Sequence, residues 1–124
     1  MQIVYYSFAN NTKRFVNKLD TELEIVTIDD YNKAEQFILI TPTYNYGGIP
    51  DPVSHFLELN GRKLLAVISS GNRNWGEVFA QAGNKIASLY DVPLLHKFEM
   101  SGNEKDVEIV NNILKRYYWE LKGR

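Results

Sequence analysis

The chain has 124 residues, enough for one domain around a single core, and its net charge of −1 argues against non-specific binding to nucleic acid or to an acidic membrane. It contains no cysteine, which excludes disulfides, cysteine nucleophiles and cysteine-based metal sites, so any redox chemistry needs a bound cofactor. Because the sequence has neither an apolar stretch long enough to cross a bilayer nor a signal-peptide pattern at Met1, we expect a cytoplasmic protein.

Alternation and continuous apolar runs predict strands, and apolar residues three to four apart predict helices. In chain order the patterns predict strand 2–7, helix 12–19, strand 24–28, strand 37–41, helix 50–60, strand 63–69, helix 77–90, strand 93–100 and helix 105–121. The runs 37–41 (FILIT) and 63–69 (KLLAVIS) are almost entirely apolar, which is typical of strands buried on both faces of a parallel sheet. Gly61 is placed to stop the helix before it.

This order of elements predicts one α/β domain over residues 1–124, with a doubly wound, five-stranded parallel sheet in the order 2-1-3-4-5. One connection is unusual. Only residues 29–36 separate the second strand from the third, whereas a parallel crossover usually takes about a dozen residues or more. We therefore expect a shortened crossover at this point, formed by a compressed turn of helix; the alternative is that the strand boundaries differ from those predicted.

Three loops carry polar, glycine and aromatic residues, and each follows a predicted strand and precedes a predicted helix. They are residues 8–11, 42–48 and 70–75. In an open parallel sheet the carboxyl ends of the strands lie at one edge, and ligands bind there where the strand order reverses. We therefore expect loops that are far apart in sequence to form one binding site.

The first loop suits an anion. Ser7, Asn11 and Thr12 carry side-chain donors, and the backbone amides that follow lie at a predicted helix N-terminus, so a terminal phosphate is the natural ligand. The alternative is an ordinary helix cap, because Asn and Thr commonly begin helices.

The other two loops suit a flat ring. Tyr44 and Tyr46 stand in a glycine-rich turn, and Trp75 follows the amides Asn72 and Asn74. Aromatic faces can stack on a heteroaromatic ring while amides and backbone groups bind its edge. The alternatives are a surface turn and a tryptophan that packs over a helix start. Taken together, a phosphate end, an aromatic slot and a donor-rich edge match FMN.

The residues predicted to contact FMN belong to these loops and the strand ends before them. They are Ser7, Phe8, Ala9, Asn10, Asn11, Thr12, Thr41, Pro42, Thr43, Tyr44, Asn45, Tyr46, Gly47, Ser70, Gly71, Asn72, Asn74, Trp75 and Gly76. No catalytic side chain is expected, because the cofactor carries the chemistry. No metal site is expected either, since His55 and His96 lack neighbours at metal-ligand spacing.

Specific motifs carry a family resemblance that extends over essentially the whole chain. Residues 7–12 (SFANNT) resemble the flavodoxin phosphate loop Ser/Thr-x-Thr-Gly-Asn-Thr. Residues 70–76 (SGNRNWG), with 92–102 (VPLLHKFEMSG) and 106–108 (DVE), are similar to the NrdI family of small flavodoxin-like proteins that serve class Ib ribonucleotide reductase. Ala9 and Asn10 replace the usual Thr-Gly, and Asn10 tolerates the left-handed backbone that glycine would adopt.

The resemblance implies a flavoprotein whose reduced FMN reacts with O2 to give superoxide. The oxidant would pass to the small, radical-bearing subunit of the reductase for assembly of its dimanganese–tyrosyl radical cofactor. An unidentified reductant would supply the electrons. The alternatives are an ordinary flavodoxin-like electron carrier and a flavin-free module that works through protein contacts.

Two further hypotheses concern the loops. Residues 41–50 and 69–76 contain no Asp or Glu but include Arg73, so we expect a neutral or slightly positive slot that favours the anionic, fully reduced flavin. Gly47 and Gly48 suggest that the second loop changes conformation with the redox state of the flavin.

Overall fold

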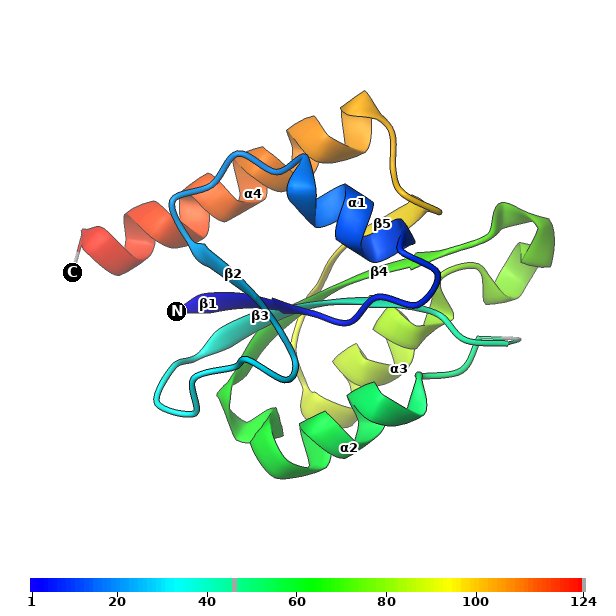
Figure 1. Ribbon diagram of the computed structural model, residues 1–124, viewed down its shortest axis with the longest axis horizontal. Coiled ribbons are helices and arrows are strands. Elements are labelled where there is room, and N and C mark those ends of the chain that lie inside the picture. Colours follow the sequence, from blue (N-terminus) through cyan, green and yellow to red (C-terminus); the bar gives the residue numbers. More distant parts are fainter. Residues whose placement is uncertain (46, 124) are drawn as a thin grey trace.

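A parallel sheet forms the centre of the computed structural model, which describes residues 1–45 and 47–123. Its strands are β1 (Gln2–Tyr5), β2 (Glu24–Thr27), β3 (Phe37–Pro42), β4 (Leu64–Gly71) and β5 (Leu94–Glu99). Their order is β2-β1-β3-β4-β5, with every neighbouring pair parallel (Figure 1). The predicted doubly wound fold is therefore confirmed.

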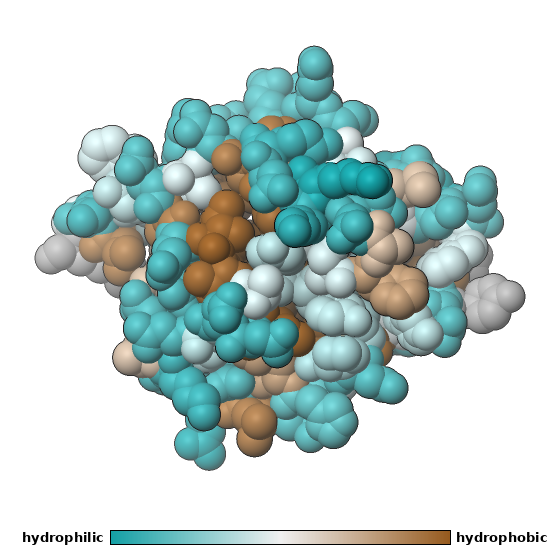
Figure 2. Space-filling model, in the orientation of Figure 1, coloured by the Kyte–Doolittle hydropathy of each residue, from teal (hydrophilic) through white to brown (hydrophobic). Residues whose placement is uncertain are grey.

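Helices cover both faces of the sheet. On one face lie α1 (Asn11–Asn17) and α4 (Glu104–Lys122), and on the other lie α2 (Asp51–Asn60) and α3 (Gln81–Tyr90) (Figure 1). Because strand side chains alternate, Ile3 joins the first core while Val4 joins the second. None of the described helices is long and apolar enough to cross a membrane. Hydrophilic residues cover most of the surface seen in Figure 2, around smaller hydrophobic patches.

The first core includes a stacked aromatic pair that joins helix α1 to strand β5. The ring centroids of Phe15 and Phe98 are 3.9 Å apart, with both side chains fully buried. Both cores are built from the apolar residues whose spacing predicted the strands and helices. Burial of these side chains is the main force that holds the helices on the sheet.

The shortened crossover between β2 and β3 is present and contains no helix. Tyr31 takes the place of a helix over this part of the sheet, since its ring meets Phe37 at 4.9 Å and Phe56 at 5.3 Å in edge-to-face contacts. The Tyr31 hydroxyl donates to the backbone oxygen of Glu35, and the Asn32 N–H donates to Gln2 Oε1 at 3.1 Å. One aromatic residue and these hydrogen bonds replace the missing amphipathic helix.

Helix α3 begins later than predicted. The sequence pattern placed its start at residue 77, but residues Arg73–Val78 form the 3-10 segment η2, and α3 starts at Gln81. Gly76 has a φ of 58° and kinks the chain within η2, and Ala80, with a φ of 51°, lies between η2 and α3. Apolar periodicity continued across this break, so it hid the kink from the sequence analysis.

Helix α2 ends at Asn60 with Gly61 as its C-cap, as predicted. Gly61 does not adopt the left-handed conformation of a glycine helix stop, because its φ is −60°. A Cβ at this position would lie 2.3 Å from Cε1 of Tyr90, so the glycine makes room for a tyrosine ring. The chain continues through a short 3-10 turn, η1 (Gly61–Lys63), into β4.

Candidate functional site

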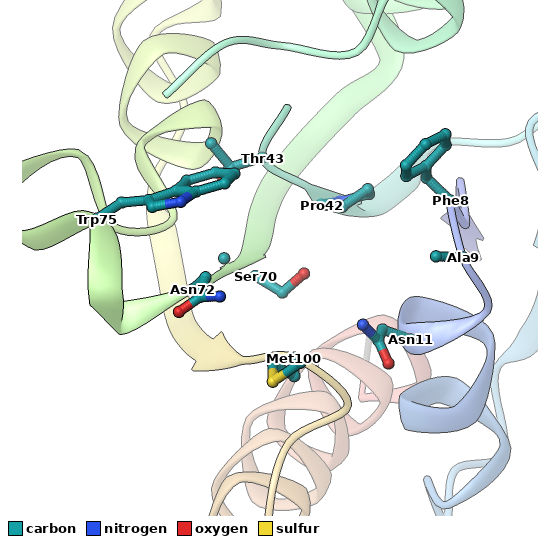
Figure 3. Close-up of a pocket in the computed structure, with 10 residues that line it drawn as sticks. Phe8, Ala9, Asn11, Pro42, Thr43, Ser70, Asn72, Trp75 and Met100 are labelled. Atoms are coloured by element: carbon teal, nitrogen blue, oxygen red, sulfur yellow. The ribbon is translucent and has the colours of Figure 1, made fainter. Parts of the chain in front are cut away.

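An open cavity of about 190 Å³ lies at the carboxyl edge of the sheet, where the three predicted loops meet (Figure 3). Ten residues line it: Phe8, Ala9, Asn11, Pro42, Thr43, Ser70, Gly71, Asn72, Trp75 and Met100. All except Met100 are among the residues that the sequence singled out. The topology thus brings together segments that are at least 25 positions apart in the sequence.

Backbone hydrogen bonds beyond the regular strands hold the floor of the cavity. The Thr43 N–H donates to the Ser70 oxygen at 2.9 Å, and the Met100 N–H donates to the Gly71 oxygen at 3.0 Å. Gly71 must remain a glycine, because a Cβ there would lie 2.5 Å from the backbone nitrogen of Ala80. The ends of β3, β4 and β5 therefore form a rigid platform.

The first loop turns sharply into α1. Ala9 and Asn10 both adopt left-handed backbone, with φ of 59° and 67°, so Asn10 does keep the shape expected from glycine. Asn10 does not cap the helix with its side chain. That role belongs to Ser7, whose Oγ accepts the Lys13 N–H at 3.1 Å. The amides of Asn11 and Thr12, at the first two helical positions, have no partner within the helix.

Thr12 provides the sharpest indication of an anion at this point. Its side chain is fully buried, yet Oγ1 has no hydrogen-bond partner among the described residues. A buried hydroxyl without a partner typically costs about 1–3 kcal/mol, so such groups are uncommon unless a ligand completes them. The hydroxyl and open amides at the start of α1 fit the phosphate of FMN.

The second loop is anchored by threonines with different roles. The Thr43 Oγ1 accepts the Ala82 N–H at 3.1 Å and thereby caps α3, whose own N-cap residue makes no side-chain bond. Thr41 is fully buried, and its hydroxyl donates to the Pro42 oxygen at 2.9 Å. Although it was predicted as a contact, Thr41 does not line the cavity.

The tip of the second loop is a closed turn. Tyr44 and Gly48 exchange two backbone hydrogen bonds of 2.7 Å, with Asn45 and Gly47 at φ of 50° and 92° inside the turn. A Cβ on Gly47 would lie 2.9 Å from Oε1 of Gln81, so the turn sits against the start of α3. Tyr46, also predicted as a contact, lies outside the described residues.

Aromatic side chains stand on opposite sides of the cavity. Figure 3 shows Trp75 on one side and Phe8 on the other, with Pro42 and Ser70 between them. Tyr44 meets Phe8 edge-to-face with ring centroids 5.6 Å apart, and both of these side chains are exposed. The space between the aromatic groups is a slot that a flat ring could enter.

The third loop orients an amide toward this slot. The Asn72 Oδ1 accepts the Asn74 N–H at 2.9 Å, which leaves the amide nitrogen of Asn72 directed into the cavity (Figure 3). Gly76 has φ of 58° and ψ of −121°, a conformation that suits glycine. Asn74 and Gly76 do not line the cavity but shape the turn that carries Trp75.

Arg73 is not the unpaired positive charge that the sequence suggested. Its backbone N–H donates to Glu99 Oε2 at 3.0 Å, and its side-chain Nε lies 3.9 Å from Glu99 Oε1. Its guanidinium lies 4.5 Å above the ring of Phe79. The sequence analysis missed this pair because Glu99 comes from β5, far along the chain.

Met100 is the lining residue that the sequence analysis missed. It follows β5 directly, and β5 pairs with β4, so its position at the same edge could have been inferred from the predicted topology. Its φ of 54° is unusual for a residue that is not glycine. The loop after the fifth strand therefore adds a fourth segment to the site.

Comparison with known proteins identifies the relatives of this chain. The family described as NrdI Flavodoxin like matches residues 3–112. Protein NrdI of Macrococcus caseolyticus is 47% identical over 111 residues, which cover 90% of this chain and 86% of that protein.

Solved structures show the same fold at low sequence identity. A short-chain flavodoxin associated with a bacterial microcompartment superposes with a TM-score of 0.71 at 16% identity, covering 92% of this chain and 93% of that one. The two-electron reduced flavodoxin of Megasphaera elsdenii gives 0.66 at 13% identity, covering 93% and 98%. With the family match over most of its length, this chain belongs to the NrdI family of flavodoxin-like proteins.

Proposed function

We propose that this protein is an FMN flavoprotein of the NrdI type that, once reduced, converts O2 to superoxide. The superoxide would serve assembly of the dimanganese–tyrosyl radical cofactor in the small subunit of class Ib ribonucleotide reductase. The single observation that carries the proposal is the meeting of the three loops around one cavity. The lining residue Asn11 is followed by Thr12, whose buried hydroxyl has no partner among the described residues.

The cofactor itself follows from the family. NrdI proteins and flavodoxins are FMN-binding proteins, so the FMN predicted from the sequence is confirmed. The family name also supports an association with ribonucleotide reductase. The small subunit as partner, O2 as acceptor and an unidentified reductant as electron donor are parts of the proposal.

The phosphate of FMN would bind at the start of α1. Thr12 Oγ1 is buried and has no partner in the part of the chain that the structure describes, and the amides of Asn11 and Thr12 point out of the first helical turn. The Ser7 oxygen already accepts the Lys13 N–H, so its hydroxyl hydrogen remains available to a phosphate oxygen. These neutral donors would stabilise the phosphate through hydrogen bonds without requiring a charged side chain inside the cavity.

The flavin ring would lie in the slot between Trp75 and the pair formed by Phe8 and Tyr44. Ser70 Oγ and the amide nitrogen of Asn72 would donate to polar atoms at its edge. The remaining predicted residues of the loops keep the turns in shape. FMN supplies one- and two-electron redox chemistry that no side chain in the site offers.

The size of the cavity bears on access of O2. At about 190 Å³ it is smaller than the roughly 300–1,000 Å³ of pockets that enclose a ligand. A ring bound here would therefore keep one edge open to solvent. O2 could reach that edge and superoxide could leave without a loop having to open.

A spectroscopic experiment tests the proposal. The protein is mixed with FMN, reduced without air, and then mixed rapidly with O2 in the presence of a superoxide trap. We expect a protein-bound flavin spectrum and trapped superoxide on reoxidation. A colourless protein that leaves the FMN spectrum unchanged would exclude a flavin site. Bound flavin that reoxidises without superoxide would instead indicate an electron carrier, the function that the flavodoxin fold also serves.

A further inference from the structure

Met100 is an exposed methionine at the cavity, and the proposed function gives its thioether no role. It lines the cavity and is 52% exposed, whereas the side chain of Met1, the other methionine of the chain, is 4% exposed. In the view of Figure 3 the Met100 side chain lies between Asn11 and Asn72, whose amide nitrogens point into the cavity.

The turn that carries Met100 is firmly held. The Met100 N–H donates to the Gly71 oxygen at 3.0 Å, and the Gly102 N–H donates to the Glu99 oxygen at 2.8 Å. Helix α4 follows at once, with Asn103 and Asp106 forming reciprocal capping bonds of 2.9 Å. The thioether is therefore kept at the rim of the cavity by structure on both sides of it.

We propose that Met100 is an oxidation site through which hydrogen peroxide weakens the binding of FMN. The source of peroxide rests on the proposed function: two superoxide ions and two protons give one hydrogen peroxide and one O2. Peroxide then transfers one oxygen atom to the sulfur of Met100. The O–O bond breaks, an S–O bond forms, the thioether is oxidised to the sulfoxide, and the peroxide is reduced to water.

The expected loss of affinity follows from hydrogen bonding. A thioether is a weak acceptor, whereas a sulfoxide oxygen is polar and accepts strongly. Formed at this rim, it would compete for the amide donors of Asn11 and Asn72, which face the space that the cofactor would enter. Oxidation would thus replace an apolar thioether in the cavity wall by a polar sulfoxide, which would compete with FMN for the amide hydrogen-bond donors.

The test begins with flavin-free protein and added hydrogen peroxide, so it needs no flavin chemistry. Peptide mass spectrometry measures oxygen uptake at Met100 and at Met1, and titration with FMN measures Kd before and after oxidation. We expect Met100 to be oxidised well before Met1 and Kd to rise about fivefold, the size expected for loss of one hydrogen bond. Methionine sulfoxide reductase should restore the original Kd.

Met100→Leu is the matched control, because leucine keeps the size and the unbranched Cβ that the left-handed backbone at this position requires. Its Kd should not respond to peroxide. Oxidation of Met1 first, an unchanged Kd in the oxidised protein, or an equal rise in Met100→Leu would overturn the proposal. If added peroxide has the expected effects but the reduced, FMN-loaded protein makes no oxidant in air, the proposed function fails while the oxidation site stands.

Discussion

At the scale of single residues, two buried threonines make opposite contributions to the site. Thr12 and Thr41 are both fully buried, but Thr41 donates a hydrogen bond to the Pro42 oxygen and Thr12 has no partner among the described residues. A hydroxyl left without a partner destabilises the flavin-free protein, and under the proposed function the same hydroxyl would stabilise the complex by donating a hydrogen bond to the phosphate. Thr12 would then lower the stability of the flavin-free protein and raise its affinity for FMN.

Replacing Thr12 by valine separates these effects, since valine has nearly the same shape without the hydroxyl. We expect Thr12→Val to raise the free energy of unfolding of the flavin-free protein by about 1 kcal/mol and to raise the Kd for FMN about tenfold. Thermal unfolding and fluorescence titration measure the two quantities.

Thr41→Val is the control for this prediction. It removes a satisfied hydrogen bond away from the cavity, so it should lower stability by about 1 kcal/mol and leave the Kd unchanged. If Thr12→Val loses stability and keeps the Kd of the wild type, the Thr12 hydroxyl is structural and the phosphate lies elsewhere.

At the scale of elements, the site depends on contacts between loops that belong to different strands. Glu99, at the end of β5, holds the third loop through the backbone N–H of Arg73 and balances the charge of its guanidinium. Thr43 of the second loop caps α3. The third loop is thus held by a residue of β5, and the second loop is tied to the start of α3, so these parts of the site depend on one another.

Glu99→Gln keeps an acceptor for the Arg73 N–H but removes the negative charge. We expect the two-electron midpoint potential of bound FMN to become more positive, because the uncompensated Arg73 charge would stabilise the anionic reduced flavin. The Kd for oxidised FMN should change little. A redox titration beside an FMN titration measures both.

Glu99→Ala removes the acceptor as well and so releases the third loop. It should raise the Kd and alter the fluorescence of Trp75, effects that Glu99→Gln should lack. Identical potentials in the wild type and in Glu99→Gln would mean that the Arg73–Glu99 pair is too far from the flavin to influence it.

At the scale of the whole molecule, tyrosines distributed over the fold link stability to alkaline pH. Burial raises the pKa of Tyr31, Tyr90 and Tyr117, and a nearby carboxylate adds to the rise in each case: Glu35, Glu58 and Glu120 respectively. The folded protein therefore keeps protons that the unfolded chain releases above about pH 10.

The stabilisation from a raised tyrosine pKa is complete below the pKa of the unfolded chain and is lost as pH rises through the higher pKa of the folded protein. We expect urea-unfolding free energies to fall above about pH 10. Tyr31→Phe should make this fall less steep. An unchanged steepness would mean that ionisation of Tyr31 does not contribute to the loss of stability.

Hydrophobic periodicity and loop chemistry determined most of the architecture before any coordinates. The continuous apolar runs of β3 and β4 led to a parallel sheet, and the order of elements led to the edge where the loops meet. Local patterns suffice here because strand burial and helix amphipathicity repeat over short distances in sequence. The eight-residue connection 29–36 was already recognisable as a shortened crossover, although not as a segment without a helix that Tyr31 fills.

Only the tertiary structure decided the contacts between residues far apart in the chain. Sequence could not reveal that Glu99 pairs with Arg73, that Thr43 caps α3, or that the buried Thr12 hydroxyl has no partner among the residues that the structure describes. Nor did it reveal the kink before α3, because apolar spacing runs through the left-handed residues. Periodicity reports which face of an element is buried, whereas hydrogen bonds and ion pairs depend on where separate elements come to lie together.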